Sequence, residues 1–171
     1  MADGISPVQF SDGGLSAVSA TTTDSAAAKP LGERVQQGGN EYVYCHNAGG
    51  TQISQGEMGR IGAASMNSGY SVTVTNAASQ TGGLFTVGVA NNGTIAAGDY
   101  GYLLVRGVTL IALDGDEVSM NSGVDIAAGV DGGFVAAAVT LSTGVRIGFT
   151  LNSAVTTVGT AKAWFKSPIF G

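Results

Sequence analysis

The chain has 171 residues, of which 44% are hydrophobic, 7% aromatic and 11% charged, and its formal net charge is −5. The basic residues are dispersed along the sequence, so no cluster matches a phosphate backbone and we expect no direct nucleic-acid binding. The single cysteine excludes an internal disulfide framework, and no apolar run reaches the roughly 20 residues of a membrane helix. The first residues lack the pattern of a Sec signal, so we expect a protein made in a cytoplasm with no membrane partner. The low charge indicates a surface partly covered by copies of the chain or by another protein.

Residues 1–39 are predicted to form an extended, low-complexity N-terminal arm. Small polar residues predominate, and Pro30 ends any helix that begins shortly before it. One interpretation is a disordered tail. The other is an arm that becomes ordered on a neighbouring molecule, with Phe10, Leu15 and Leu31 as its contacts. We favour the second interpretation, because a pure spacer would not need large apolar side chains.

Residues 40–171 are predicted to form a single all-β domain. Short segments of alternating polarity, separated by Gly, Asn and Asp turns, indicate a β-sandwich or barrel-like domain. In the first segment, 41–47, Tyr42, Tyr44 and His46 share one face, whereas Val43 and Cys45 share the other. The other short strands are expected within 58–61, 70–76, 84–90, 123–129, 132–139, 144–151 and 160–166.

The stretch 97–113 is predicted to be the central strand, or pair of strands, of this domain. Its first half carries apolar side chains on both faces, which is typical of a strand covered on both sides. One face holds Tyr102, Leu104 and Arg106, and the other holds Leu103 and Val105. Gly107 is the expected site of a bend or bulge, because no side chain stands in the way there.

The last two segments alternate in the same way. In 144–151 the pattern predicts that Val145, Ile147, Phe149 and Leu151 are buried and that Arg146 and Thr150 are exposed. In 160–166 it places Lys162, Trp164 and Lys166 on one face and Ala163 and Phe165 on the other.

We find no catalytic, cofactor-binding or metal-binding constellation in the sequence. His46 is the one histidine, and Cys45 points to the opposite face of the same strand, so the two cannot act as a pair. One chain also lacks enough nitrogen and sulfur ligands for zinc, although a trimer could gather three copies of His46 on its axis.

The acidic residues between Arg106 and Arg146 were weighed as a calcium site or a catalytic group. The members are Asp114, Asp116, Glu117, Asp125 and Asp131. Oxygen ligands at alternate positions suit calcium, but the remaining ligands of a calcium loop are absent. Asp-Gly dipeptides are favoured in turns, so we interpret 114–116 and 130–133 as turns rather than as a binding or catalytic site.

The run 88–118 resembles the decoration and minor head proteins of tailed bacteriophages. A Gly-Asp step, an aromatic strand, a central glycine and a second Gly-Asp step carry the resemblance, and they fall at Gly98, Asp99, Tyr100, Gly101, Tyr102, Gly107, Gly115 and Asp116. The segments 84–90 and 126–139 and the aromatic C-terminus resemble that family too. The similarity covers the C-terminal two thirds of the chain and does not include the arm.

The resemblance implies a β-sandwich or β-tulip domain that binds the outside of a capsid, as a homotrimer, and cements the lattice of the major capsid protein. Such a protein is made in the host cytoplasm and becomes part of the virion exterior. The residues expected at partner interfaces are Phe10, Leu15, Leu31, Arg34, Trp164 and Phe165. The alternative is a carbohydrate-binding or adhesin-like module, with Tyr42, Tyr44 and Trp164 as sugar-stacking platforms. An enzyme built on the acidic residues is the third hypothesis.

Overall fold

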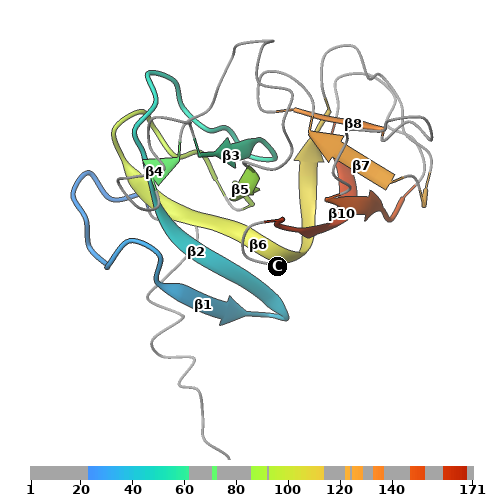
Figure 1. Ribbon diagram of the computed structural model, residues 1–171, viewed down its shortest axis with the longest axis horizontal. Coiled ribbons are helices and arrows are strands. Elements are labelled where there is room, and N and C mark those ends of the chain that lie inside the picture. The colour runs from blue at the N-terminus through green and yellow to red at the C-terminus, as the bar shows by residue number, and fades with distance from the viewer. Residues whose placement is uncertain are drawn as a thin grey trace, which may run out of the picture.

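The computed structural model describes residues 23–61, 71–72, 86–91, 93–113, 122–123, 125–128, 133–136, 147–152 and 160–168. Within these ranges all regular secondary structure is β, and ten strands form one sheet (Figure 1). The predicted all-β class is therefore confirmed. The predicted turn at 114–116 and the predicted turn around Asp131 lie outside the described residues.

Most strands fall where the alternation of polarity predicts them. The first five are β1 (Arg34–Gln37), β2 (Asn40–Asn47), β3 (Met58–Arg60), β4 (Ser71–Val72) and β5 (Thr86–Val89). The others are β6 (Tyr100–Ala112), β7 (Asp125–Ala128), β8 (Phe134–Ala136), β9 (Gly148–Thr150) and β10 (Thr160–Lys166). The exception is β1, which lies inside the predicted arm.

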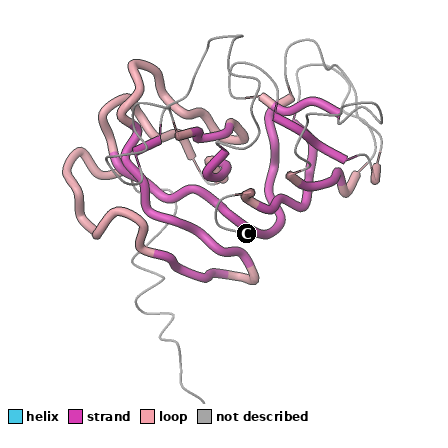
Figure 2. The backbone as a smooth tube through the Cα atoms, viewed as in Figure 1, coloured by secondary structure: helices cyan, strands magenta, loops and turns pink. Residues whose placement is uncertain are grey.

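The sheet follows the order β1-β2-β6-β10-β9-β7-β8, with β5 also paired to β6, β3 to β5, and β4 to β2. The pairing of β4 with β2 is parallel and the other strand pairs are antiparallel. One isolated bridge connects Leu113, just after β6, to Phe134 of β8. Over the described residues the sheet is nevertheless not closed into a barrel, and its ten strands belong to one sheet rather than to two separate ones. Figure 2 shows these strands in magenta and the loops between them in pink.

Strand β6 organises the sheet, as the sequence predicts. Its first half pairs with β2 and its second half, from Arg106 to Ala112, pairs with β10. Figure 1 shows the strand bending sharply between these halves. The four residues on both faces of its first half, Tyr102 to Val105, are buried, so the strand is covered on both sides.

Gly107 marks the bend, which confirms its predicted role. Its φ of +131° lies in a region that glycine occupies far more readily than other residues. A Cβ at this position would also overlap the Asn40 side chain. The pairing register between β2 and β6 shifts next to it, between Glu41 and Tyr42. Only glycine satisfies both the backbone angle and the close approach.

Two clusters of buried side chains lie on opposite faces of β2 and β6. One cluster comprises Val43, Cys45, Ile53, Val87, Ala90, Ile95, Leu103 and Val105. The other comprises Tyr42, Tyr44, Met58, Val89, Tyr102, Leu104, Ile111, Ile126, Phe134, Ile147, Ala161, Ala163 and Phe165. The predicted separation of the β2 side chains between two faces is thus confirmed for its buried residues.

The described part of the predicted arm, from residue 23 to 39, makes regular contacts with the sheet. Asp24 exchanges two backbone hydrogen bonds with Tyr100, at 3.0 and 2.8 Å. Strand β1 pairs with β2 over its whole length. The sheet therefore begins before Asn40, whereas residues 1–22 lie outside the described part of the chain. The division of the chain into arm and domain stays a prediction.

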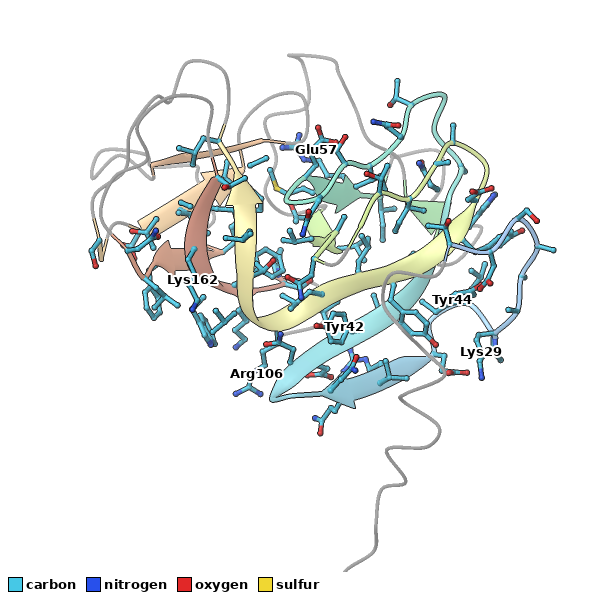
Figure 3. All side chains as sticks on the ribbon, turned by 180° about the vertical axis from the view of Figure 1, so that it is seen from behind. Lys29, Tyr42, Tyr44, Glu57, Arg106 and Lys162 are labelled. Carbon is cyan, nitrogen blue, oxygen red and sulfur yellow. The ribbon has the colours of Figure 1, made fainter. Side chains whose placement is uncertain are left out.

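Residues 24–33, which we call the strap, are held by two tyrosine hydroxyls of the sheet. Tyr44 Oη donates to Asp24 Oδ2 at 2.8 Å and accepts the Ala28 N–H at 3.2 Å. Tyr102 Oη donates to Glu33 Oε1 at 3.0 Å. Figure 3 shows Tyr44 beside the loop that carries Lys29. The strap is thus fixed at both ends by hydrogen bonds to carboxylates.

Candidate interaction surface

Large apolar side chains gather on the side of β6, β10 and β9 that faces away from the core. Trp164 of β10 lies opposite Val108 of β6 and Phe149 of β9. Its ring stacks on Phe149, with centroids 5.7 Å apart and planes 22° from parallel. These three residues form one row across the strands. In the next row, two residues along each strand, Leu110 of β6 lies opposite Lys162 of β10, and the Lys162 carbonyl accepts the Leu151 N–H at 2.8 Å. We call the apolar members of these two rows the outer face: Val108, Leu110, Phe149, Leu151 and Trp164.

The outer face is exposed although it is built from core-type residues. Trp164 is half-buried, and the other four side chains are 37 to 43% exposed. Within the described residues, Leu31 is the one other large hydrophobic side chain in this exposure class. A contiguous apolar surface of this kind marks an interaction site more often than scattered exposed residues do.

The exposure of the β6 and β10 side chains follows from the two-residue period of a strand. Thr109 and Ile111 of β6 point inward, together with Ala161, Ala163 and Phe165 of β10. Their neighbours in the sequence must then point outward. The predicted alternation in 160–166 is confirmed.

The predicted burial of residues 149–151 is wrong. Phe149 and Leu151 are each 40% exposed, and Thr150 is buried. Ile147 is buried as predicted, so the alternation shifts by one residue at Gly148. A Cβ at Gly148 would overlap the Trp164 carbonyl oxygen, which shows how closely the two backbones approach here. Val145 and Arg146 lie outside the described residues.

Basic side chains border the outer face. Lys162 and Lys166 alternate with Trp164 on β10, and Arg106 lies opposite Lys166 on β6. All three are exposed, and Figure 3 shows Arg106 and Lys162 on the same side of the molecule. Two acids of the described strands are in line with these residues: Asp125 lies opposite Phe149, and Glu41, which forms an ion pair with Arg34, lies opposite Arg106. The surface is therefore apolar with an excess of positive charge.

Of the four predicted interface residues that the structure describes, one lies on this face. Trp164 belongs to it, but Phe165 points into the core and has no exposed surface. Leu31 is exposed in the strap, and Arg34 of β1 forms an ion pair with Glu41 at 3.2 Å. Both lie near β1, which β2 and β6 separate from β10 in the sheet order. Phe10 and Leu15 lie outside the described residues.

Sequence reasoning missed the other four residues of the outer face. A usable signal existed for β6, because Val108 and Leu110 are in phase with Arg106, and a charged side chain favours the solvent side of a strand. No such signal existed for Phe149 and Leu151, because their exposure depends on the shift at Gly148.

Cys45 and His46, which the sequence analysis considered as chemical groups, both have structural roles. Cys45 is buried, and burial raises the pKa of its thiol. The His46 ring stacks on Tyr100 at 4.4 Å, and its Nε2 lies 3.1 Å from the Gly98 carbonyl oxygen. In the part of the chain that is described, no three His, Cys, Asp or Glu side chains gather as metal ligands. In the same ranges, no helix is long and apolar enough to span a bilayer.

Two of the three aromatic residues considered as sugar platforms are inaccessible. Tyr42 is 3% exposed and Tyr44 has no exposed surface. Burial, together with the hydrogen bond to Asp24, raises the pKa of Tyr44 to about 12. Only Trp164, stacked on Phe149, presents an aromatic surface of the kind that could face a sugar ring.

Comparisons with known proteins give a likeness of structure but none of sequence. No protein-family model and no curated protein matches the chain. Among solved structures, the N base of the head fiber gp8.5 of bacteriophage phi29 is similar, with a TM-score of 0.49 and 13% sequence identity. The match covers 74% of this chain and 95% of that chain. A likeness of this degree carries no conclusion about function.

Proposed function

We propose that this protein is a structural component of a tailed-bacteriophage virion that binds the capsid exterior and stabilises the lattice of the major capsid protein, without catalysis. The observation that carries the proposal is the outer face, an exposed apolar surface on strands that are otherwise well packed. The sequence resemblance of residues 88–118 to head decoration proteins supports the choice of partner. The head fiber likeness adds no weight to it.

A protein of this kind stabilises a shell by linkage. It binds the assembled lattice and not the separate capsid subunits, so the assembled state is lowered in free energy by the binding. The low content of charged residues, 11%, suits a chain whose surface is largely covered in the assembly. We propose a closed homo-oligomer, a trimer by the resemblance, as the form that binds.

The test uses the full-length protein and empty shells of its cognate major capsid protein. We expect light scattering to give a closed oligomer, sedimentation to show saturable binding to shells, and bound shells to resist heating better than bare ones. Binding to unassembled capsid subunits should be at least tenfold weaker. A monomer that neither sediments with shells nor changes their thermal stability would contradict the proposal.

Carbohydrate binding is the second candidate function, because Trp164 and Phe149 form a stacked aromatic pair on the surface. Exchange of Trp164 for Ala should then abolish a signal on a glycan array. An array with no signal above background would exclude this candidate and leave the structural role.

A further inference from the structure

We infer that the outer face is covered by residues 3–15 of a second copy of this chain, so that each copy donates its N-terminal segment and accepts that of a neighbour. The inference rests on the proposed function in one respect, namely that the protein works as a homo-oligomer. It adds the surface and the segment that hold the copies together.

The outer face requires an apolar occupant. Val108, Leu110, Phe149 and Leu151 are each more than a third exposed, and they lie in adjacent rows of neighbouring strands. The N-terminal segment supplies suitable side chains, because it carries Ile5, Val8, Phe10 and Leu15 within eleven positions. Burying such side chains against one another removes apolar area from water, which stabilises the association.

The outer face and the N-terminal segment carry complementary charges. Arg106, Lys162 and Lys166 border the outer face. The acids in line with them on the described strands are Asp125 and Glu41, and Glu41 is already paired with Arg34, so positive charge is in excess. Residues 1–22 include Asp3 and Asp12 and no basic residue. Two outer faces packed against each other would bring like charges together, which is unfavourable. The charge pattern therefore favours the acidic segment over a face-to-face dimer.

The proposed homo-oligomer favours a second copy over the same copy as the donor of the segment. Asp24 is fixed to Tyr100 at the start of β6, whereas Val108 and Leu110 lie beyond the bend of that strand (Figure 1). Donation to a neighbour links the copies to one another, and repeated donation closes a ring where the rotation between the copies closes.

The first experiment places the photo-reactive residue p-benzoylphenylalanine at position 10 of the full-length protein. We expect irradiation to give covalent dimers whose cross-linked peptides come from 106–112, 147–152 or 160–166. The same residue placed at position 31, exposed but away from the outer face, is the matched control and should not label those peptides. Cross-links confined to one chain, or directed to other surfaces, would overturn the inference.

The second experiment weakens the acceptor with the double substitution Leu110→Gln and Phe149→Gln. Both side chains are exposed, so the fold should survive, which thermal unfolding can confirm. We expect the yield of cross-linked dimer from position 10 to fall at least tenfold, while Leu31→Gln leaves it unchanged. An unchanged yield in the double variant would refute the proposed acceptor.

Shell binding, measured in parallel on the unmodified protein, separates the two proposals. If shells are bound but position 10 labels other surfaces, the inference is wrong and the proposed function stands. If position 10 labels the outer face of a second copy but shells are ignored, the inference stands and the proposed function is wrong.

Discussion

The side chain of Asn40 holds the backbone of Val108 at the bend of β6. Asn40 Oδ1 accepts the Val108 N–H at 2.9 Å, and Asn40 Nδ2 donates to the Val108 carbonyl oxygen at 3.2 Å. The β2–β6 ladder ends at Glu41 and Arg106. Beyond that point, the Asn40 side chain makes the hydrogen bonds to Val108 that the backbone of a paired strand would otherwise make. Gly107 lies directly against it, so the amide fits only if residue 107 has no side chain.

Gly107→Val should destabilise the protein by at least about 2 kcal/mol, because the new side chain meets both an unfavourable φ and the Asn40 amide. Urea unfolding measures the effect. Gly50→Ala is the matched control, since a Cβ there meets nothing within 4 Å, and its effect should stay within about 0.5 kcal/mol. Equal effects of the two substitutions would contradict the described bend.

Tyr44→Phe and Tyr102→Phe should each lower the free energy of unfolding by about 1.5–3 kcal/mol, the usual range for a hydrogen bond to a charged group. Each substitution removes the hydroxyl that donates to a strap carboxylate, at Asp24 or Glu33. Hydrogen exchange at the Ala28 amide should accelerate in the Tyr44 variant, because that amide donates to the lost oxygen. Asp24→Asn keeps an acceptor and should cost less; an equal cost would show that the hydrogen bond is not the cause.

Stability should decrease as pH rises above about 10. Burial and the Asp24 hydrogen bond raise the pKa of Tyr44 from 10.0 to about 12, and burial with Glu33 raises the pKa of Tyr102. The unfolded chain loses these protons near pH 10, whereas the folded chain keeps them to higher pH. The unfolded state therefore binds fewer protons in this window, and the free energy of unfolding falls.

Urea midpoints measured at about pH 8 and about pH 11 test this dependence on pH. The Tyr44→Phe/Tyr102→Phe double variant should show a clearly shallower decrease than the natural chain. Identical slopes for the two proteins would exclude these tyrosines as the source.

Ile147→Ala and Phe149→Ala should differ strongly in their effect on folding. Ile147 is buried, so its truncation should cost about 2–5 kcal/mol of stability. Phe149 lies on the outer face and is 40% exposed, so its truncation should cost about 1 kcal/mol or less and mainly weaken self-association. Thermal unfolding and light scattering measure the two effects. A larger loss of stability at Phe149 would restore the alternation that the sequence predicts for 144–151.

The sequence predicted the local features of this fold well. The alternation in 41–47 separates Tyr42 and Tyr44 from Val43 and Cys45, because a strand has a fixed period of two. Gly107 could be recognised because it interrupts a segment that is apolar on both sides. The pairing of β1 with β2 was missed, since the polar segment 34–37 has no apolar face that would mark it as a strand.

The outer face was harder to predict for two physical reasons. In the second half of β6, Val108 and Leu110 alternate with Thr109 and Ile111, so the hydropathy of these four residues does not say which side is buried, and the phase of Arg106 is the one local signal. At Phe149, the direction depends on the approach of Gly148 to the Trp164 carbonyl, sixteen residues away along the chain. Contacts of that kind leave no local trace in the sequence.

Strand β6 also determines how a mechanical load would pass through the molecule. A pull on the chain before Asp24 reaches β6 at Tyr100 and runs lengthwise toward Val108 and Leu110. Hydrogen bonds of an antiparallel ladder lie across the strands, so a lengthwise force shears the ladders with β2 and β10 and loads their bonds together. A force across the strands would instead open the bonds one after another. A load applied along either half of β6 should therefore need a larger force to separate its ladder than a load applied across the strands.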